Sequence, residues 1–327
     1  MRPSFERIRY RLSTFPDLAD LPYSALSVGM LDLPSPNAFA DEIDDGCCLG
    51  IHTGLLISVA ETAALLRDAL GAFSDDRSGR KFGESEPEGM PIGVRAFLSI
   101  RNSGIFDDAL LGEARTDDLV NRRGIFFISC ALQFAMLHEF GHIVHGHLKW
   151  LAERRSTPSL REIDGSGYDG REKWIDVLRF FEHESDIWAL QILIETAAAG
   201  QNVGIVAGVP ADEWLPLLLL AFLTTILVWS ELENVFGRAA NSRHPGALER
   251  QAAMTLAIIN VLDSRPEAER LVAEGLRRAQ QIVHALGVRH ARFRILSSMF
   301  ESPAIGEADA VRTSMEKMAS LIAADRV

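Results

Sequence analysis

The chain has few cysteines and no excess of positive charge, and each of these absences excludes a class of protein. Of its 327 residues only three are cysteine, Cys47, Cys48 and Cys130, and two of these are adjacent. Such a set is no disulfide framework and favours a reducing compartment. The 33 Lys and Arg residues stand against 45 Asp and Glu residues, a net charge of −12, whereas phosphate binding requires clustered positive charge. We therefore expect no nucleic-acid partner.

The N-terminal residues also do not have the pattern of a secretory signal peptide. The first dozen residues are basic, but they are not followed by the apolar stretch of about 7–15 residues that such a signal needs. The resulting expectation is a cytoplasmic location.

Long hydrophobic runs are scarce, and only residues 214–229 raise the question of a membrane. They carry no charge over 16 positions, but a bilayer span needs about 20 apolar residues with basic residues on its cytoplasmic side. The flanks are acidic instead, with Asp212 and Glu213 before the run. This composition favours a helix buried in a large helical core. Membrane association is the less favoured alternative.

The rest of the sequence predicts a single domain over residues 1–327, of class α+β and mainly α, with a small sheet and a long helix. Its 47% hydrophobic content is sufficient for a sizeable core. Residues 65–125 are predicted to be an insertion of unknown role, and residues 260–327 a C-terminal helical extension. The expected elements are a buried strand at 47–57 that leads into a helix, a strand at 92–100, and helices at 123–155, 172–199, 213–236, 246–263, 266–286 and 308–324.

The chemical signal is the pattern His138-Glu139-x-x-His142 inside the apolar helix 123–155. Residues four apart on an α-helix differ by about 40° in azimuth and about 6 Å along the axis, so both imidazoles can reach one ion. Catalytic zinc takes three protein ligands and leaves a position for water. Glu139, beside the first histidine, is then placed to accept that water's proton.

A third ligand must come from elsewhere in the sequence. The extended pattern H-E-x-x-H-x-x-G-x-x-H fails, because His145 stands at its glycine and Leu148 at its last histidine. His145 and His147 lie about 4–8 Å further along a continuing helix than His142. We therefore expect them beside the site or on the surface.

The helix at 172–199 offers acidic candidates for the third ligand. Glu182 and Asp186 are four residues apart and share a face, whereas Glu184 points to the other side. We expect Glu182 to bind the metal and Asp186 to accept a hydrogen bond from the outer nitrogen of a ligand histidine. A solvated acidic face is the alternative, although the neighbours are largely apolar.

These motifs resemble the gluzincin zinc metallopeptidases, in particular the CAAX prenyl protease and HtpX-like group. The matching segments are LHEFGHIVHGH at 137–147, E-x-E-x-D at 182–186, SPNAFADEIDDGCCLGIHTGLL at 35–56 and RHPGALER at 243–250. The resemblance implies a zincin-like fold in which the second half of 35–56 is an edge strand that lies over the metal and pairs with substrate backbone.

The resemblance also implies roles for individual residues. Asn37, Ala38 and Phe39 would bind substrate, His244 would stabilise the oxyanion, and Arg250 would orient the neighbouring acidic groups. For His244 the alternative is a loop histidine in front of a helix.

The chain departs from the familiar members of that group in two respects. Leu56 and His138 are separated by 81 residues, a much longer segment, and Ser185 stands where alanine is usual. The long spacing is more similar to the phage-exclusion Lit-type cytosolic peptidases. The resemblance thus implies a zinc-dependent endopeptidase that acts on protein or peptide substrates, with a phage-defence or regulatory role and an unidentified activating partner. The alternative is a structural zinc ion that only holds helices together in a sensor or partner-binding module.

Overall fold

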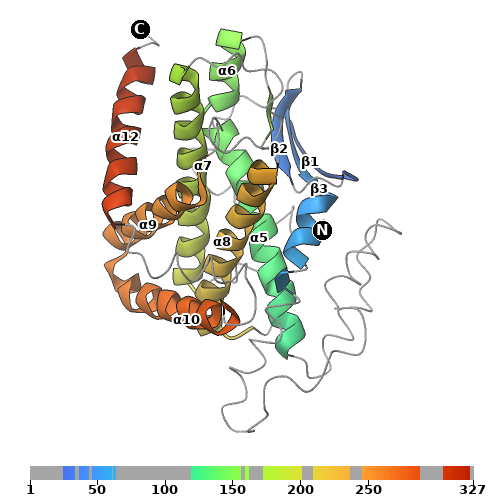
Figure 1. The fold of residues 1–327 in the computed structure, drawn as a ribbon, viewed down its shortest axis with the longest axis vertical. Coiled ribbons are helices and arrows are strands. Elements are labelled where there is room, and N and C mark those ends of the chain that lie inside the picture. The colour runs from blue at the N-terminus through green and yellow to red at the C-terminus, as the bar shows by residue number, and fades with distance from the viewer. Residues whose placement is uncertain are drawn as a thin grey trace.

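The computed structural model is mainly helical with one small sheet (Figure 1). The predicted class, α+β and mainly α, is confirmed. The predicted strand at 92–100 and most of the predicted insertion at 65–125 lie outside the described residues. The residues described are 25–33, 37–43, 46–60, 62–63, 119–155, 159–161, 172–200, 209–235, 245–287 and 305–324.

The sheet has four strands in the order β1-β3-β2-β4. Strand β3 pairs in parallel with β1 and antiparallel with β2, and β2 pairs antiparallel with the short β4. Phe39 of β2 lies over Gly50 of β3, where an added Cβ would be 2.0 Å from Phe39 Cε1, so a larger residue there would displace the Phe39 ring. The strands are Ala25–Leu31 (β1), Ala38–Ile43 (β2), Gly46–His52 (β3) and Ser159–Arg161 (β4).

The strand predicted at 47–57 is present as β3, but two features differ from the prediction. It ends at His52, because residues 53–60 are already helical. The expectation of an edge strand is wrong, because β3 is paired on both sides, by β1 and by β2. Within the described residues the edges of the sheet are β1 and β4.

The helices after residue 172 lie where the sequence predicts them, within three residues at each end. The one difference of type is a short 3-10 helix, Pro266–Ala268, in front of α10, at the start of the predicted helix 266–286. The helices are α5 (Leu119–Val144), α6 (His147–Arg155), α7 (Glu172–Ala198), α8 (Ala211–Val235), α9 (Ala247–Ser264), α10 (Glu269–Gly287) and α12 (Ile305–Ala324).

The single long helix predicted at 123–155 is wrong. Helix α5 begins earlier, at Leu119, so the end of the predicted insertion 65–125 is helix. It ends at Val144, and α6 begins at His147. Gly146 has φ +70° and its N–H donates to Ile143 O at 3.0 Å. This left-handed glycine ends the helix in the usual manner of a C-terminal cap.

Helix α8 forms the centre of the hydrophobic core. Residues 215–229 are all buried, and α8 packs against α5, α7, α9 and α10. The prediction of a buried core helix at 214–229 is therefore confirmed. By length and composition alone, α5 and α8 could each cross a membrane. Most of each is buried within the protein, and core helices of soluble proteins pass the same test, so this indication is weak.

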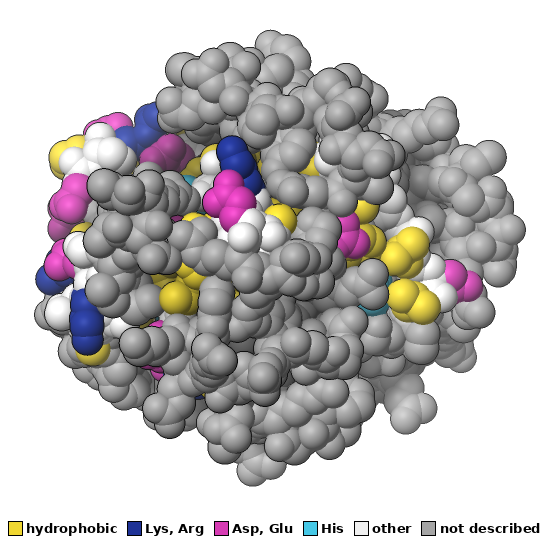
Figure 2. All heavy atoms as spheres, turned by 90° about the horizontal axis from the view of Figure 1, so that it is seen from above, with side chains coloured by type: hydrophobic (Ala, Val, Ile, Leu, Met, Phe, Trp, Pro, Cys, Tyr) yellow, Lys and Arg dark blue, Asp and Glu magenta, His cyan; other side chains and the backbone are white. Residues whose placement is uncertain are grey.

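The C-terminal helices complete the bundle. Helix α10 packs against α8, and α12 packs against α9 and α7 (Figure 1). Ala279 and Val283 of α10 are fully buried in the main core. Helix α10 thus contributes to the folded core, and α12 packs on its outside through the partly buried Val311 and Met315. Among the described side chains on the face in Figure 2, acidic and basic groups are intermixed.

Candidate metal centre

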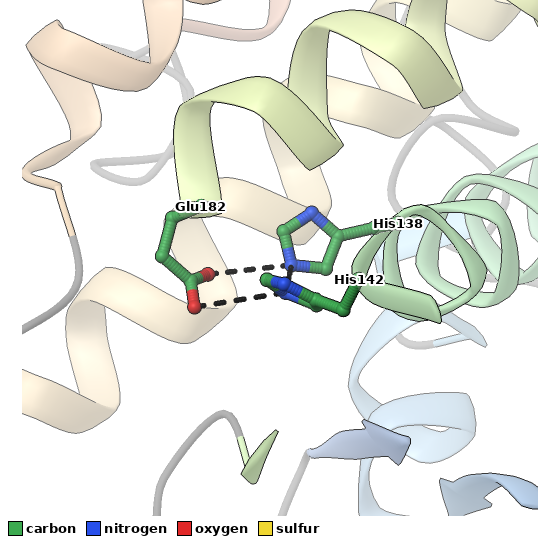
Figure 3. A group of neighbouring side chains, drawn as sticks. All are labelled: His138, His142 and Glu182. Atoms are coloured by element: carbon green, nitrogen blue, oxygen red, sulfur yellow. Dashed lines mark hydrogen bonds and ion pairs between the residues drawn. The ribbon is translucent and has the colours of Figure 1, made fainter. Parts of the chain in front are cut away.

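Two neighbouring helices bring three potential metal ligands together. His138 and His142 stand one turn apart on α5, and Glu182 faces them from α7 (Figure 3). The Nε2 atoms of the two histidines are 3.2 Å apart. Glu182 Oε2 lies 3.3 Å from His138 Nε2, and its Oε1 lies 3.7 Å from His142 Nε2. The three residues form a buried group that could hold a metal ion.

A glycine allows α5 and α7 to approach at this point. A Cβ added to Gly141 would lie 3.1 Å from both Cα and Oγ of Ser185. Gly141 precedes His142 in the sequence, Ser185 precedes Asp186, and Ser185 is fully buried. The small pair therefore sets the separation across which Glu182 reaches the histidines.

Asp186 holds the outer side of one ligand. Its Oδ1 lies 2.8 Å from His138 Nδ1, at hydrogen-bond distance. A proton on Nδ1 would leave His138 Nε2, which faces His142 and Glu182, available to a metal. The structure brings Asp186 to the histidine as predicted, and the hydrogen bond between them stays a prediction.

Arg250 of α9 joins the two acidic residues of α7. One of its terminal nitrogens, NH2, donates to Glu182 Oε2 at 3.0 Å, and its Nε lies 3.0 Å from Asp186 Oδ2. Its guanidinium also lies over the Trp229 ring, 4.7 Å from the centroid, a cation–π contact. The arginine expected to orient the acidic groups therefore touches both of them.

The centre buries charged groups of both signs. Glu139 and Glu182 are each 2% exposed and Asp186 is 0% exposed, while Arg250 is 1% exposed. Isolated buried charge is strongly unfavourable, so the contacts of Arg250 with Glu182 and Asp186 compensate part of this buried charge.

The next two histidines in the sequence, His145 and His147, lie beside the candidate ligands. His147 is 2% exposed, and its Nδ1 lies 2.9 Å from His142 Nδ1. Its Nε2 lies 2.8 Å from Glu184 Oε2. Burial lowers the pKa of His145, and the carboxylate of Glu184 opposes that shift. As predicted, Glu184 turns away from the metal ligands.

The predicted substrate-binding residues lie at the start of β2. Asn37, Ala38 and Phe39 are all buried. The backbone carbonyl of Asn37 accepts a hydrogen bond from His52 N at 2.9 Å, and its side-chain Oδ1 has no hydrogen-bond partner among the described residues. Contact of these residues with substrate stays a prediction. His244, the predicted oxyanion donor, lies outside the described residues.

Of the two positions expected for His147, beside the site or on the surface, the structure shows the first. The signal for it in the sequence is Gly146, a typical helix-ending residue, because a helix that ends there releases His147 from the axis of α5. On one continuous helix over 123–155 the contact with His142 is not expected.

No protein-family model, curated protein or solved structure matches this chain.

Proposed function

We propose that this protein is a zinc-dependent endopeptidase with a zincin-like fold of the gluzincin type. The observation that carries the proposal is the buried group of His138, His142 and Glu182, with Glu139 next to the first ligand on the same helix. The order and spacing of these residues agree with the resemblance to gluzincin peptidases. A cytoplasmic location and a phage-defence or regulatory role rest on sequence alone.

Two properties of the donor set favour zinc. Two imidazoles and one carboxylate are a donor set that catalytic zinc uses, whereas magnesium and calcium prefer oxygen donors alone. Zinc bonds of about 2.0–2.1 Å in tetrahedral geometry place ligand atoms about 3.3 Å apart. The two histidine Nε2 atoms are 3.2 Å apart, and the carboxylate of Glu182 lies 3.3 Å from one through Oε2 and 3.7 Å from the other through Oε1.

When bound, zinc would supply a Lewis acid that polarises a peptide carbonyl and acidifies water. The residues of the chain then have distinct roles. Glu139 accepts a proton from the attacking water on its carboxylate and later donates it to the departing amine. Asp186 and Arg250 hold His138 and Glu182 in place. By the resemblance, His244 would donate a hydrogen bond to the oxyanion.

The substrate is proposed to be a protein or peptide. This proposal rests on the resemblance, because β3 has no free edge to which an extended peptide could add. The competing function is a structural zinc site, which would need four protein ligands. Within the part of the chain that the structure describes, the group has three members, and this supports a catalytic site with an open fourth position.

The test compares zinc content and peptide hydrolysis in Glu139→Gln and in a matched control. Glu153→Gln alters an exposed glutamate of α6. We expect about one zinc per chain in all three proteins, and a loss of at least about 10²-fold in hydrolysis of a peptide library in Glu139→Gln alone. Unchanged hydrolysis in Glu139→Gln would overturn the proposal. Zinc held by four protein ligands in an inactive wild type would identify a structural site.

A further inference from the structure

A buried histidine outside the ligand group connects His142 to the rim of the centre. His142 Nδ1 and His147 Nδ1 are 2.9 Å apart, and His147 Nε2 is 2.8 Å from Glu184 Oε2. His147 is 2% exposed, whereas the side chain of Glu184 is 32% exposed. The three side chains form a row from the metal ligand to the partly open edge of α7.

The positions of the protons in this row follow from the ligand at its inner end. His142 directs Nε2 at the other two ligands, so this nitrogen must be free of a proton to bind a metal. The proton of the neutral ring is then on Nδ1 and is donated to His147 Nδ1. His147 Nδ1 must be an acceptor, so the proton of this ring is on Nε2 and is donated to Glu184. Each ring nitrogen of His142 and His147 is thus assigned one role, as metal ligand, hydrogen-bond donor or hydrogen-bond acceptor.

We propose that His147, held by Glu184, is a positioning residue that fixes the tautomer and the ring orientation of His142 for metal binding. This inference rests on the proposed zinc site. It assigns to His142 the same kind of support that Asp186 gives to His138, with an imidazole in place of a carboxylate. Such outer contacts typically contribute a factor of about 10–100 to metal affinity.

The break between α5 and α6 makes this contact geometrically accessible. On one continuous helix His147 would lie about 140° around the axis from His142 and about 7.5 Å further along. Because Gly146 takes φ +70° and α6 starts at His147, the His147 ring instead turns back to His142. The ring also stacks on Phe181 of α7, with centroids 4.0 Å apart and planes 15° apart, which fixes its plane.

Two substitutions separate positioning from packing. His147→Asn places an amide oxygen where Nδ1 was, so an acceptor for His142 remains, but the stacked ring is lost. His147→Phe keeps a ring on Phe181 but removes the acceptor that faces His142 Nδ1. The positioning role predicts that His147→Phe loses about 10–100-fold in zinc affinity and His147→Asn loses less. A packing role predicts the reverse order.

The readout is the zinc dissociation constant, measured by competition with a chromophoric chelator, together with the melting temperature of the zinc-free proteins. His284→Phe, which removes an exposed histidine of α10, is the control and is expected to bind zinc as the wild type does. Glu184→Gln keeps an acceptor for His147 and should lose less affinity than Glu184→Leu.

The outcomes of this experiment are distinct from those that test the peptidase. A wild type that binds zinc tightly, with His147→Phe binding equally well, would overturn the positioning role and leave the zinc site intact. Weaker binding in His147→Asn than in His147→Phe would also overturn it. A wild type that binds no zinc would remove the metal site itself, and with it both proposals.

Discussion

Gly141 and Ser185 meet where α5 and α7 approach, and a Cβ on Gly141 would lie only 3.1 Å from Ser185 Cα. Gly141 is next to His142 and Phe140 on α5, and Ser185 is next to Asp186 on α7. The contact therefore lies within the candidate centre and determines how closely α5 and α7 approach each other there.

Gly141→Ala is expected to lower both stability and zinc affinity. The added methyl group meets backbone atoms of α7, so the helices must separate, at a cost of about 1–3 kcal/mol. Gly124→Ala is the matched control on the same helix, because a Cβ there meets no atom within 4 Å, and it should gain about 0.5–1 kcal/mol from helix propensity. Denaturant unfolding and chelator competition measure the two effects. Equal stabilisation by both substitutions would contradict a tight contact.

Ser185→Ala is expected to raise the free energy of unfolding. Ser185 Oγ is buried and has no hydrogen-bond partner among the described residues, and burial of an unsatisfied polar group costs about 1–3 kcal/mol. The matched control is Ser58→Ala, because Ser58 Oγ donates to Gly54 O at 3.0 Å, and its removal should lower stability by about 0.5–1.5 kcal/mol. Opposite signs in denaturant unfolding are the expected result, and a loss of stability in Ser185→Ala would contradict it.

The sequence predicts the helical bundle well because the signal there is local. The apolar run 214–229 and the amphipathic periodicity of the later helices are sufficient to locate the core. The placement of Glu182 and Asp186 on the same face of α7 was also predictable, because residues four apart on a helix share a face. These predictions need only the geometry of a single helix.

The predictions that are wrong concern features that depend on contacts between segments far apart in the sequence. The resemblance implies that β3 is an edge strand, but its neighbour β1 comes from residues before Asn37, and no local pattern reports that pairing. The position of His147 depends on a helix end at Gly146. A glycine inside an apolar helical pattern is also compatible with close helix packing, which is the role of Gly141, so sequence alone does not separate the two.

Arg250 is expected to stabilise the metal-free protein more than the zinc-bound protein. It contacts both Glu182 and Asp186, and loss of one partner from a buried ionic group costs about 3–5 kcal/mol. In Arg250→Met a bound cation still compensates Glu182, so the loss should be smaller with zinc than with chelator. Arg277→Met is the control, because its ion pair with Glu274 is exposed and contributes about 0–1 kcal/mol. Unfolding curves with and without chelator give the comparison, and equal losses in both would contradict compensation by the metal.

Removal of the metal is expected to destabilise the wild type, because the folded protein then loses the bond between the metal and the Glu182 carboxylate. A ligand at 100 times its dissociation constant stabilises the folded state by about 2.7 kcal/mol, so added chelator should lower the melting temperature. Glu182→Gln loses the carboxylate of the group and should melt at the same temperature with and without chelator. Glu195→Gln changes a glutamate of the same helix that accepts a hydrogen bond from Gln191, and it should keep the chelator response. If chelator leaves the wild type unchanged while metal analysis finds no bound ion, the centre is no metal site.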